Sequence, residues 1–246
     1  MKYSVSFSGG KDSTAMLHWL IEKGCPIDAI IFFDTGWEFP AMLKHIDLVE
    51  EKTGLKITRV HPKKSFDHWL RKAEIVARKG PMKGKVHRIG NGWPSPLRRW
   101  CSRQKINAID NAIKELMPVS VYIGIAADEP TRVNTKGKYT KLYPLVEWGK
   151  TEQDCLDYCK ELGYTWDGLY DVFQRVSCFC CPLQRIGELR ALRKYYPELW
   201  AKMLEWDETM PSNEGFRGYA TVRDLEERFK NEGGYLVMPP PEQSDS

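Results

Sequence analysis

The sequence predicts an α/β protein with a parallel twisted sheet, helices on both faces of the sheet, and a helical C-terminal region that carries a cysteine cluster. Two observations predict this class. Between residues 3 and 60, short apolar runs typical of strands alternate with segments of helical apolar spacing, which is the pattern of βαβ units. Beyond residue 150, the apolar spacing is helical throughout.

The first part of the chain reads as three strands and two helices. Pro40 is expected to open the second helix and Gly54 to end it, because proline suits the first turn and glycine the position after the last. Ligands of parallel sheets bind beyond the carboxyl ends of the strands, where Ser8, Asp34 and His61 fall. The expected strands are 3–7, 28–33 and 55–60, and the expected helices are 12–23 and 40–51.

The alternation stops between residues 62 and 100. A helix is expected near 66–78, followed by a loop rich in Gly, Pro and Lys that we interpret as a lid or a binding insertion. We predict a nucleotide-binding α/β domain over 1–150, a helical region over 151–238 and a disordered tail over 239–246. The later elements are helix 101–116, strand 119–125 and helices near 151–162, 184–194, 197–207 and 221–230.

Positive charge is concentrated in residues 63–105. This segment has thirteen Lys or Arg against two acids, Asp67 and Glu74, so it alone carries +11 in a chain whose net charge is +4. Such a surface favours a polyanionic partner such as tRNA or DNA. Bases stack on aromatic rings, which the segment supplies. The alternative is a solvated insertion whose charge only aids solubility. The aromatic residues concerned are Trp69, His87, Trp93 and Trp100.

Cysteine usage and hydropathy favour the cytoplasm. The seven cysteines are an odd number, which is unusual for a secreted disulfide framework. No apolar run is long enough to span a membrane, and a strand is expected directly at the N-terminus, where a signal peptide would otherwise stand. No membrane association is therefore expected.

A glycine-containing turn between the first strand and the first helix predicts a phosphate site. Two glycines allow a sharp bend and a close approach of the backbone to a ligand. The unpaired N–H groups and the positive dipole end of the following helix would then face an anion. Hydroxyls and one lysine add further donors. The segment consists of Ser8, Gly9, Gly10, Lys11, Asp12, Ser13 and Thr14.

The order Ser-Gly-Gly-Lys-Asp-Ser resembles the PP-loop of the ATP pyrophosphatases, also called adenine nucleotide alpha hydrolases, whose sheet is Rossmann-like (the HUP class). Within that superfamily the chain is most similar to the phosphoadenosine phosphosulfate (PAPS) reductase family over roughly residues 3–183. The segments that carry the likeness after the loop are Asp34-Thr35-Gly36, Arg99-Trp100-Cys101-Ser102, Gly124 to Glu129 with Arg132, Tyr143-Pro144-Leu145 with Trp148, and the cysteines at 178–181.

The resemblance implies roles for residues outside the loop. Asp34, Thr35 and Gly36 would border the adenosine, and Gly124 would pack near the nucleotide. Asp128, Glu129 and Arg132 would line the phosphate end, where an arginine can form bidentate bonds to phosphate oxygens. Asp12 and Asp128 could hold a Mg²⁺ ion that neutralises the departing pyrophosphate. The catalytic set is then Lys11, Asp12, Asp128 and Arg132.

Two departures from the reductases decide between activities. The sequence has no cysteine after Cys181, whereas the reductases use a nucleophilic cysteine near their C-terminus. The loop also keeps the full ATP-cleaving form that reductases usually lack. We therefore expect an enzyme that cleaves ATP to AMP and pyrophosphate and adenylates an acceptor, in iron–sulfur-assisted sulfur transfer to a nucleic acid, with a sulfur-donor protein as a further partner. The alternatives are a sulfonucleotide reductase and a non-catalytic nucleotide sensor with structural zinc.

The run Cys178-Phe179-Cys180-Cys181 predicts a metal centre. Cys-x-x-Cys spacing lets two sulfurs reach one metal, and Cys101 and Cys180 would complete four thiolates. Adjacent cysteines suit the diverging iron corners of a [4Fe–4S] cluster better than tetrahedral zinc, which stays the alternative beside redox thiols. Cys155 and Cys159, one helical turn apart, are expected to pack in the core.

Overall fold

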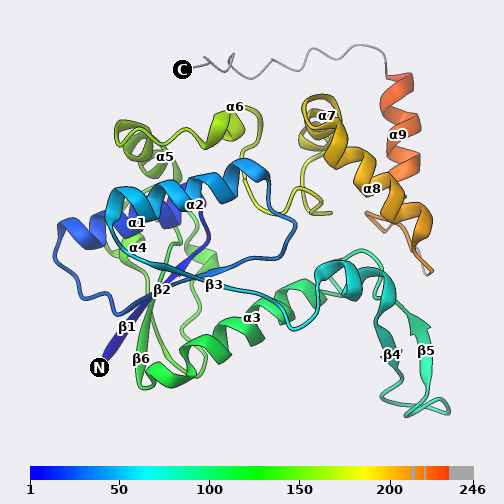
Figure 1. Ribbon diagram of the computed structural model, residues 1–246, viewed down its shortest axis with the longest axis horizontal. Coiled ribbons are helices and arrows are strands. Elements are labelled where there is room, and N and C mark those ends of the chain that lie inside the picture. Colours follow the sequence, from blue (N-terminus) through cyan, green and yellow to red (C-terminus); the bar gives the residue numbers. More distant parts are fainter. Residues whose placement is uncertain (212–213, 219, 233–246) are drawn as a thin grey trace. The chain divides into compact units, whose positions relative to one another are not determined.

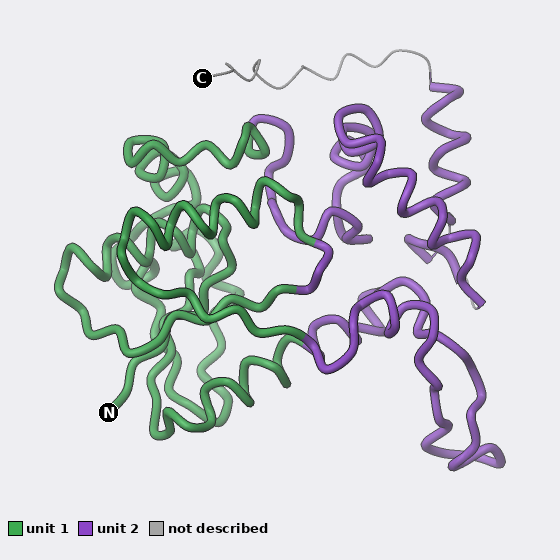
Figure 2. Tube along the Cα trace, viewed as in Figure 1, with its two compact units in different colours: residues 1–34, 38–61, 105–170 green, residues 35–37, 62–104, 171–246 purple. Residues whose placement is uncertain are grey.

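A computed structural model describes residues 1–211, 214–218 and 220–232, and the tail predicted for 239–246 lies outside these ranges. The chain divides into two compact units (Figure 2). Unit 1 comprises residues 1–34, 38–61 and 105–170; unit 2 comprises 35–37, 62–104 and 171 onward. These boundaries group the chain differently from the domain ranges 1–150 and 151–238, which stay a prediction.

Unit 1 contains the predicted parallel sheet with helices on both faces (Figure 1). Its strand order is β3-β2-β1-β6-β7, and every neighbouring pair is parallel. The strands are β1 (Lys2–Phe7), β2 (Ala29–Phe33), β3 (Ile57–Val60), β6 (Val119–Ile123) and β7 (Thr140–Leu142). The edge strand β7 was not predicted, because its three residues carry no strand signal of their own.

The strand order indicates where a ligand would bind to the sheet. After β1 the chain builds β2 and β3 on one side and then returns to add β6 on the other. The order therefore reverses between β1 and β6, and in open α/β sheets ligands bind at such a switch point, outside the carboxyl ends of the strands. The turn after Phe7 and the loop after Ile123 flank this position.

Buried faces of the strands and of two helices form the core of unit 1. Strand β2 is a nearly continuous apolar run, as expected for a strand covered on both faces. Helix α1 (Lys11–Glu22) buries Met16, Leu17 and Leu20, and α2 (Pro40–Thr53) begins at the predicted proline and ends before Gly54, whose φ is 65°. In Figure 1 these two helices cover one face of the sheet and the C-terminal part of α3 (Trp100–Ile113) the other.

The remaining helical elements of unit 1 are short, apart from α5 (Glu152–Glu161). This helix packs along α1 and starts with a capping box in which Thr151 and Asp154 satisfy each other's backbone N–H groups. The others are η2 (Lys114–Leu116), η3 (Pro130–Arg132), α4 (Pro144–Glu147), η4 (Trp166–Gly168) and α6 (Leu169–Val172), whose last residues belong to unit 2.

Unit 2 contains the predicted C-terminal helices and an unpredicted hairpin. The helices are α7 (Ile186–Tyr195), α8 (Pro197–Thr209) and α9 (Val222–Asn231). The helix predicted near 66–78 is wrong: a short π-helix, η1 (His68–Lys72), is followed by β4 (Glu74–Val76), which pairs antiparallel with β5 (Val86–Ile89). Pairing with a segment ten residues downstream overrides the local helical spacing.

Aromatic side chains form the core of unit 2. The ring of Trp37 meets those of Phe66, Trp93, Trp100 and Trp206 at centroid distances of 4.9 to 6.4 Å. Trp93 is 3% exposed and Trp100 8% exposed. The prediction that these two tryptophans offer surfaces for stacking on bases is therefore wrong, because their ring surfaces are buried against other side chains of the core.

Candidate active site

The turn Ser8–Gly10 connects β1 to α1 at the switch point of the sheet. Gly9 has a φ of +75°, a conformation that residues with a Cβ rarely adopt. A Cβ at this position would also lie 2.6 Å from the sulfur of Met42, so the second helix presses against the turn. Both the backbone angle and the packing therefore require glycine here.

Hydroxyls inside the turn hold its shape. The Ser13 hydroxyl donates to the Gly10 carbonyl oxygen at 3.0 Å and accepts from the Ser8 N–H at 3.2 Å. Thr14 is fully buried and its hydroxyl lies 3.0 Å from Nε2 of His45. Of the three hydroxyl residues in this segment that were predicted to bind the cofactor, Ser8 is exposed, whereas Ser13 and Thr14 are buried.

Lys11 brings a buried positive charge to the start of α1. Its Nζ lies 2.5 Å from Oε2 of Glu152 and 3.3 Å from Oδ1 of Asp12, and its side chain is 8% exposed. Burial by itself lowers the pKa of Lys11, but the two carboxylates outweigh this effect and raise the pKa above its ordinary value. The lysine is therefore a fixed cation beside the turn.

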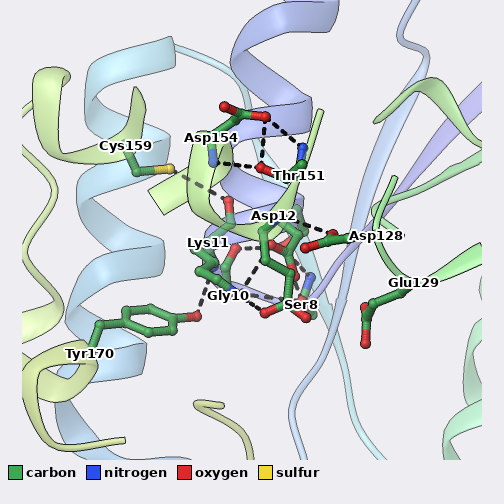
Figure 3. A network of polar contacts seen from close by, with 12 residues as sticks. Ser8, Gly10, Lys11, Asp12, Asp128, Glu129, Thr151, Asp154, Cys159 and Tyr170 are labelled. Carbon is green, nitrogen blue, oxygen red and sulfur yellow. Dashed lines mark hydrogen bonds and ion pairs between the residues drawn. The ribbon is translucent and has the colours of Figure 1, made fainter. Parts of the chain in front are cut away.

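Two residues that are distant along the chain form hydrogen bonds with the polar groups of the turn. The hydroxyl oxygen of Tyr170 accepts a hydrogen bond from the backbone N–H of Lys11 at 2.8 Å, and the indole N–H of Trp166 donates to the Gly9 carbonyl at 2.8 Å. Figure 3 shows the Tyr170 hydroxyl directed at the turn. Glu152 thus supplies an oxygen atom to the Lys11 ammonium, and Tyr170 supplies one to the Lys11 backbone N–H. A phosphate bound at the turn would otherwise accept from both groups.

Sequence reasoning missed Glu152 and Tyr170. They lie 141 and 159 residues away from Lys11 along the chain, and neither stands in a pattern that indicates phosphate chemistry. The signal that existed was the capping box Thr151-x-x-Asp154, which indicates a helix start and places Glu152 in its first turn.

Acidic residues gather beside the turn. Asp128 accepts a hydrogen bond from the backbone N–H of Glu152 at 3.1 Å, which ties the loop after β6 to the start of α5. Glu129 forms an ion pair with Arg132. Figure 3 shows Asp128 and Glu129 on the same side of the turn as Asp12. Gly124 belongs to the same loop, and a Cβ there would lie 3.1 Å from the backbone of Ser13, so this glycine lets the loop approach α1.

The environment of Asp12 raises the pKa of its carboxyl group. Burial raises its pKa, Lys11 opposes this effect, and Glu152 and Glu129 add to it, with the result that the pKa is about 6. In the unfolded chain the carboxyl titrates near its ordinary value of 3.8. Between about pH 4 and pH 6 the folded protein therefore binds more protons at this group than the unfolded chain, and stability falls as the pH rises through this window.

We expect the Asp12→Asn substitution to remove this pH dependence. The shift corresponds to a free energy of unfolding on the order of 2–3 kcal/mol, lost in the wild type between pH 4 and pH 6 and absent in the variant. Urea unfolding of both proteins at pH 4, 5, 6 and 7 measures the difference. Parallel profiles for the two proteins would contradict the assignment of a raised pKa to Asp12.

The residues after β2 are distributed over both units. In unit 1, the Asp34 N–H donates to the Val60 carbonyl at 2.9 Å, and its carboxylate lies 3.7 Å from Nδ1 of His61. In unit 2, the Thr35 hydroxyl accepts from the N–H of Trp37 at 3.0 Å and lies 3.5 Å from the sulfur of Cys178. Gly36 has a φ of +75°.

The four cysteines predicted as ligands line one cavity of unit 2. The cavity has a volume of about 90 Å³, and Trp37, Phe66 and Pro182 are among its other walls. Burial raises the pKa of Cys181, so its thiol is neutral in this environment. The cysteines that line the cavity are Cys101, Cys178, Cys180 and Cys181.

The donor set of the cavity fits a metal centre, but the side-chain positions are not those of a formed one. Four thiols suit a [4Fe–4S] cluster or a zinc ion. In the ranges that the structure describes, however, no three His, Cys, Asp or Glu side chains are arranged to hold a metal ion. Ligation would require the thiols to turn toward a common point.

Cys155 and Cys159 have the packing role expected of them. Both are fully buried on α5, and Cys159 contacts the Lys11 carbonyl oxygen through its sulfur at 3.5 Å. Burial raises the pKa of Cys159 to about 12, so this thiol is inert.

Part of the charge in the basic segment is neutralised within unit 2. Arg71 pairs with Asp67, and Arg88 and Arg98 both pair with Glu214.

Within the described residues, no helix is both long enough and apolar enough to cross a membrane.

The fold and the turn together define an α/β protein with a glycine turn and a buried lysine at the switch point of its sheet. The chain belongs to the phosphoadenosine phosphosulfate reductase domain family, whose sequence profile matches residues 2–184. Two relatives are an uncharacterised protein of Methanocaldococcus jannaschii, 28% identical over 93% of this chain and 44% of its own length, and an uncharacterised protein of Escherichia phage 186, 27% identical over 82% and 73%. The chain spans about half the length of the M. jannaschii relatives that it matches.

Two solved structures are similar to this chain. The phosphate complex of phosphoadenylyl-sulfate reductase from Candida auris has a TM-score of 0.48 and 16% identity over 71% of this chain and 80% of that one. The U34-tRNA thiolase NcsA from Methanococcus maripaludis with its [4Fe–4S] cluster has a TM-score of 0.41 and 18% identity over 97% and 78%.

Proposed function

We propose that this chain cleaves ATP between its α- and β-phosphates and transfers the adenylate to an acceptor, in a reaction that introduces sulfur into a nucleic acid. The observation that carries the proposal is the buried Lys11 ammonium beside the glycine turn, held by the carboxylate of Glu152 where the carboxyl end of β1 meets α1. A cation and a helix N-terminus at a switch point form a site for a phosphate chain.

The residues around the turn would have different roles in the reaction. An acceptor oxygen forms a bond to the α-phosphorus of ATP while the bond from that phosphorus to the bridging oxygen breaks, and pyrophosphate leaves with the bonding electrons. Lys11 and the N–H groups of the turn neutralise the charge that grows on pyrophosphate. Arg132 would exchange its bond to Glu129 for one to phosphate. Asp12 and Asp128 would hold Mg²⁺, which screens the leaving group.

The cysteine cavity would serve the sulfur step. Cys101, Cys178, Cys180 and Cys181 would hold a [4Fe–4S] cluster, which would supply an iron site for the incoming sulfur once one of these four thiolates is released. A sulfur nucleophile from a donor molecule or protein then displaces AMP from the activated acceptor. The same four thiols could instead hold a structural zinc.

Pyrophosphate release tests the first step. The purified protein is incubated with ATP and Mg²⁺, alone and with transfer RNA, single-stranded DNA or duplex DNA, and pyrophosphate and AMP are measured. We expect one nucleic acid to speed the release of pyrophosphate, with AMP following in equal amount only when sulfide is added to displace it from the adenylated acceptor. Release of sulfite from a sulfonucleotide without any need for ATP would contradict the proposal.

Metal analysis tests the cysteine cavity. Anaerobically purified protein is expected to be brown and to contain iron and sulfide, and Cys181→Ser is expected to lose most of that iron. Cys25→Ser is the matched control, because Cys25 is also half-buried but does not line the cavity. Colourless wild-type protein with one zinc ion would contradict the cluster, and equal iron in both variants would contradict the assigned ligands.

A further inference from the structure

A second cavity in unit 2 lies beside the hairpin β4–β5. It is larger than the cysteine cavity, with a volume of about 780 Å³, which is within the range of sites that bind small molecules. Its walls come from the hairpin, from η1 and from the first turn of α3. None of the residues assigned above to ATP or to the metal centre lines it.

The walls of this cavity are strongly basic. Four arginines line it against one acid, Glu74. Arg88 and Arg98 are paired with Glu214, so they mainly hold the wall in place. Arg78 and Arg103 are exposed and form no ion pair with any described residue. Two cations are thus available to an anionic ligand.

An aromatic ring also lines the cavity, and two of its wall residues carry buried donors that lack acceptors among the described residues. Trp69 lines it and is partly exposed, yet its indole N–H is buried without a hydrogen-bond partner among the described residues. The Nε–H of Arg88 is likewise buried without a hydrogen-bond partner among the described residues. Buried donors of this kind cost free energy unless a ligand or water accepts from them.

We propose that this cavity binds one unpaired nucleotide of the nucleic-acid acceptor, with Arg78 and Arg103 on its phosphates and Trp69 against its base. Arginines bind phosphate oxygens, and a base out of its stack presents both a ring face and acceptor atoms. Because a base within a duplex cannot present its face, single strands should bind better than duplexes. The choice of a nucleic acid rests on the proposed function, whereas the cavity and its charges do not.

Binding experiments without ATP test this site separately from catalysis. Fluorescence anisotropy is measured with labelled single-stranded RNA, single-stranded DNA and duplex DNA of equal length, over a series of salt concentrations. The cavity variant is Arg78→Gln with Arg103→Gln. Its matched control is Lys79→Gln with Lys83→Gln, which removes the same charge from the connection between β4 and β5 outside the cavity.

We expect the cavity variant to bind single strands at least about tenfold more weakly, and the slope of log affinity against log salt to fall by about 1.4, the value for two phosphate contacts on a single strand. The control should change affinity less than threefold. Trp69→Leu, checked for folding by circular dichroism, should weaken binding while leaving the salt slope unchanged, because stacking releases no counterions.

Three outcomes would overturn the inference. Equal losses in the cavity variant and the control would mean that diffuse charge, not the cavity, binds the strand. Equal affinity for duplex and single strands would exclude an unstacked base. No binding by the wild type would exclude the site. If that same wild-type protein releases pyrophosphate from ATP, the failure concerns this cavity and not the proposed ATP cleavage.

Discussion

Replacing Lys11 with alanine is expected to reduce pyrophosphate release by at least about 100-fold, the usual effect of removing one group that stabilises transition-state charge. Lys11 is the cation at the start of α1, and its ammonium is held in position by Asp12 and Glu152 before any ligand binds. Such preorganisation is the reason for a large effect, since the charge need not be assembled as the bond breaks.

The control for this variant is Lys23→Ala, which removes an exposed lysine just past the end of the same helix. Its turnover should equal that of the wild type. Circular dichroism and thermal unfolding of both variants separate a lost charge from a lost fold. Normal pyrophosphate release by a folded Lys11→Ala protein would contradict the assigned phosphate site.

Replacing Gly9 with alanine is expected to destabilise unit 1 and to abolish ATP cleavage. The φ of +75° costs an L-residue roughly 1–2 kcal/mol, and the new methyl group would lie 2.6 Å from the sulfur of Met42. Overpacking of this kind typically costs a further 1–3 kcal/mol. Urea unfolding should therefore show a loss on the order of 2–5 kcal/mol.

Two further variants separate the two causes. Gly24→Ala has a similar φ of +63° but no atom within 4 Å of its Cβ, so it should show only the backbone cost. Met42→Ala removes the sulfur, and in that background Gly9→Ala should cost only slightly more than Gly24→Ala does in the wild type, because the Ile46 side chain still lies 3.3 Å from the new Cβ. If Gly9→Ala and Gly24→Ala cost the same in the wild type, the contact with Met42 carries no energetic weight.

The turn and the sheet could be predicted because their signals are local. Two glycines, a lysine and flanking apolar runs specify a strand, a bend and a helix within a short segment, and the alternation after it specifies parallel strands. The hairpin β4–β5 could not be predicted in this way, because each of its strands is only three or four residues long and forms by pairing with the other.

The groups that surround the turn could not be predicted either. Glu152 and Tyr170 reach Lys11 only because α5 packs along α1, a tertiary contact with no trace in local sequence. The tryptophans show the converse error: Trp93 and Trp100 stand among basic residues in the sequence but are buried in the aromatic core. Sequence proximity to charge says nothing about which way a side chain faces.

The position of four cysteines around one cavity could be predicted only in part from local sequence. The spacing of Cys178 and Cys181 is local, whereas the participation of Cys101 came from the resemblance to the reductase family. The structure places these cysteines on the walls of one cavity, and the assignment of a metal to that cavity stays a proposal.

A structure of the protein with a non-hydrolysable ATP analogue and Mg²⁺ tests the central claim most directly. We expect phosphate oxygens to accept from the Lys11 backbone N–H and to contact its ammonium, in place of the hydroxyl of Tyr170 and the carboxylate of Glu152. An analogue bound elsewhere, with both of these internal contacts intact, would contradict the claim that the glycine turn holds the phosphate chain.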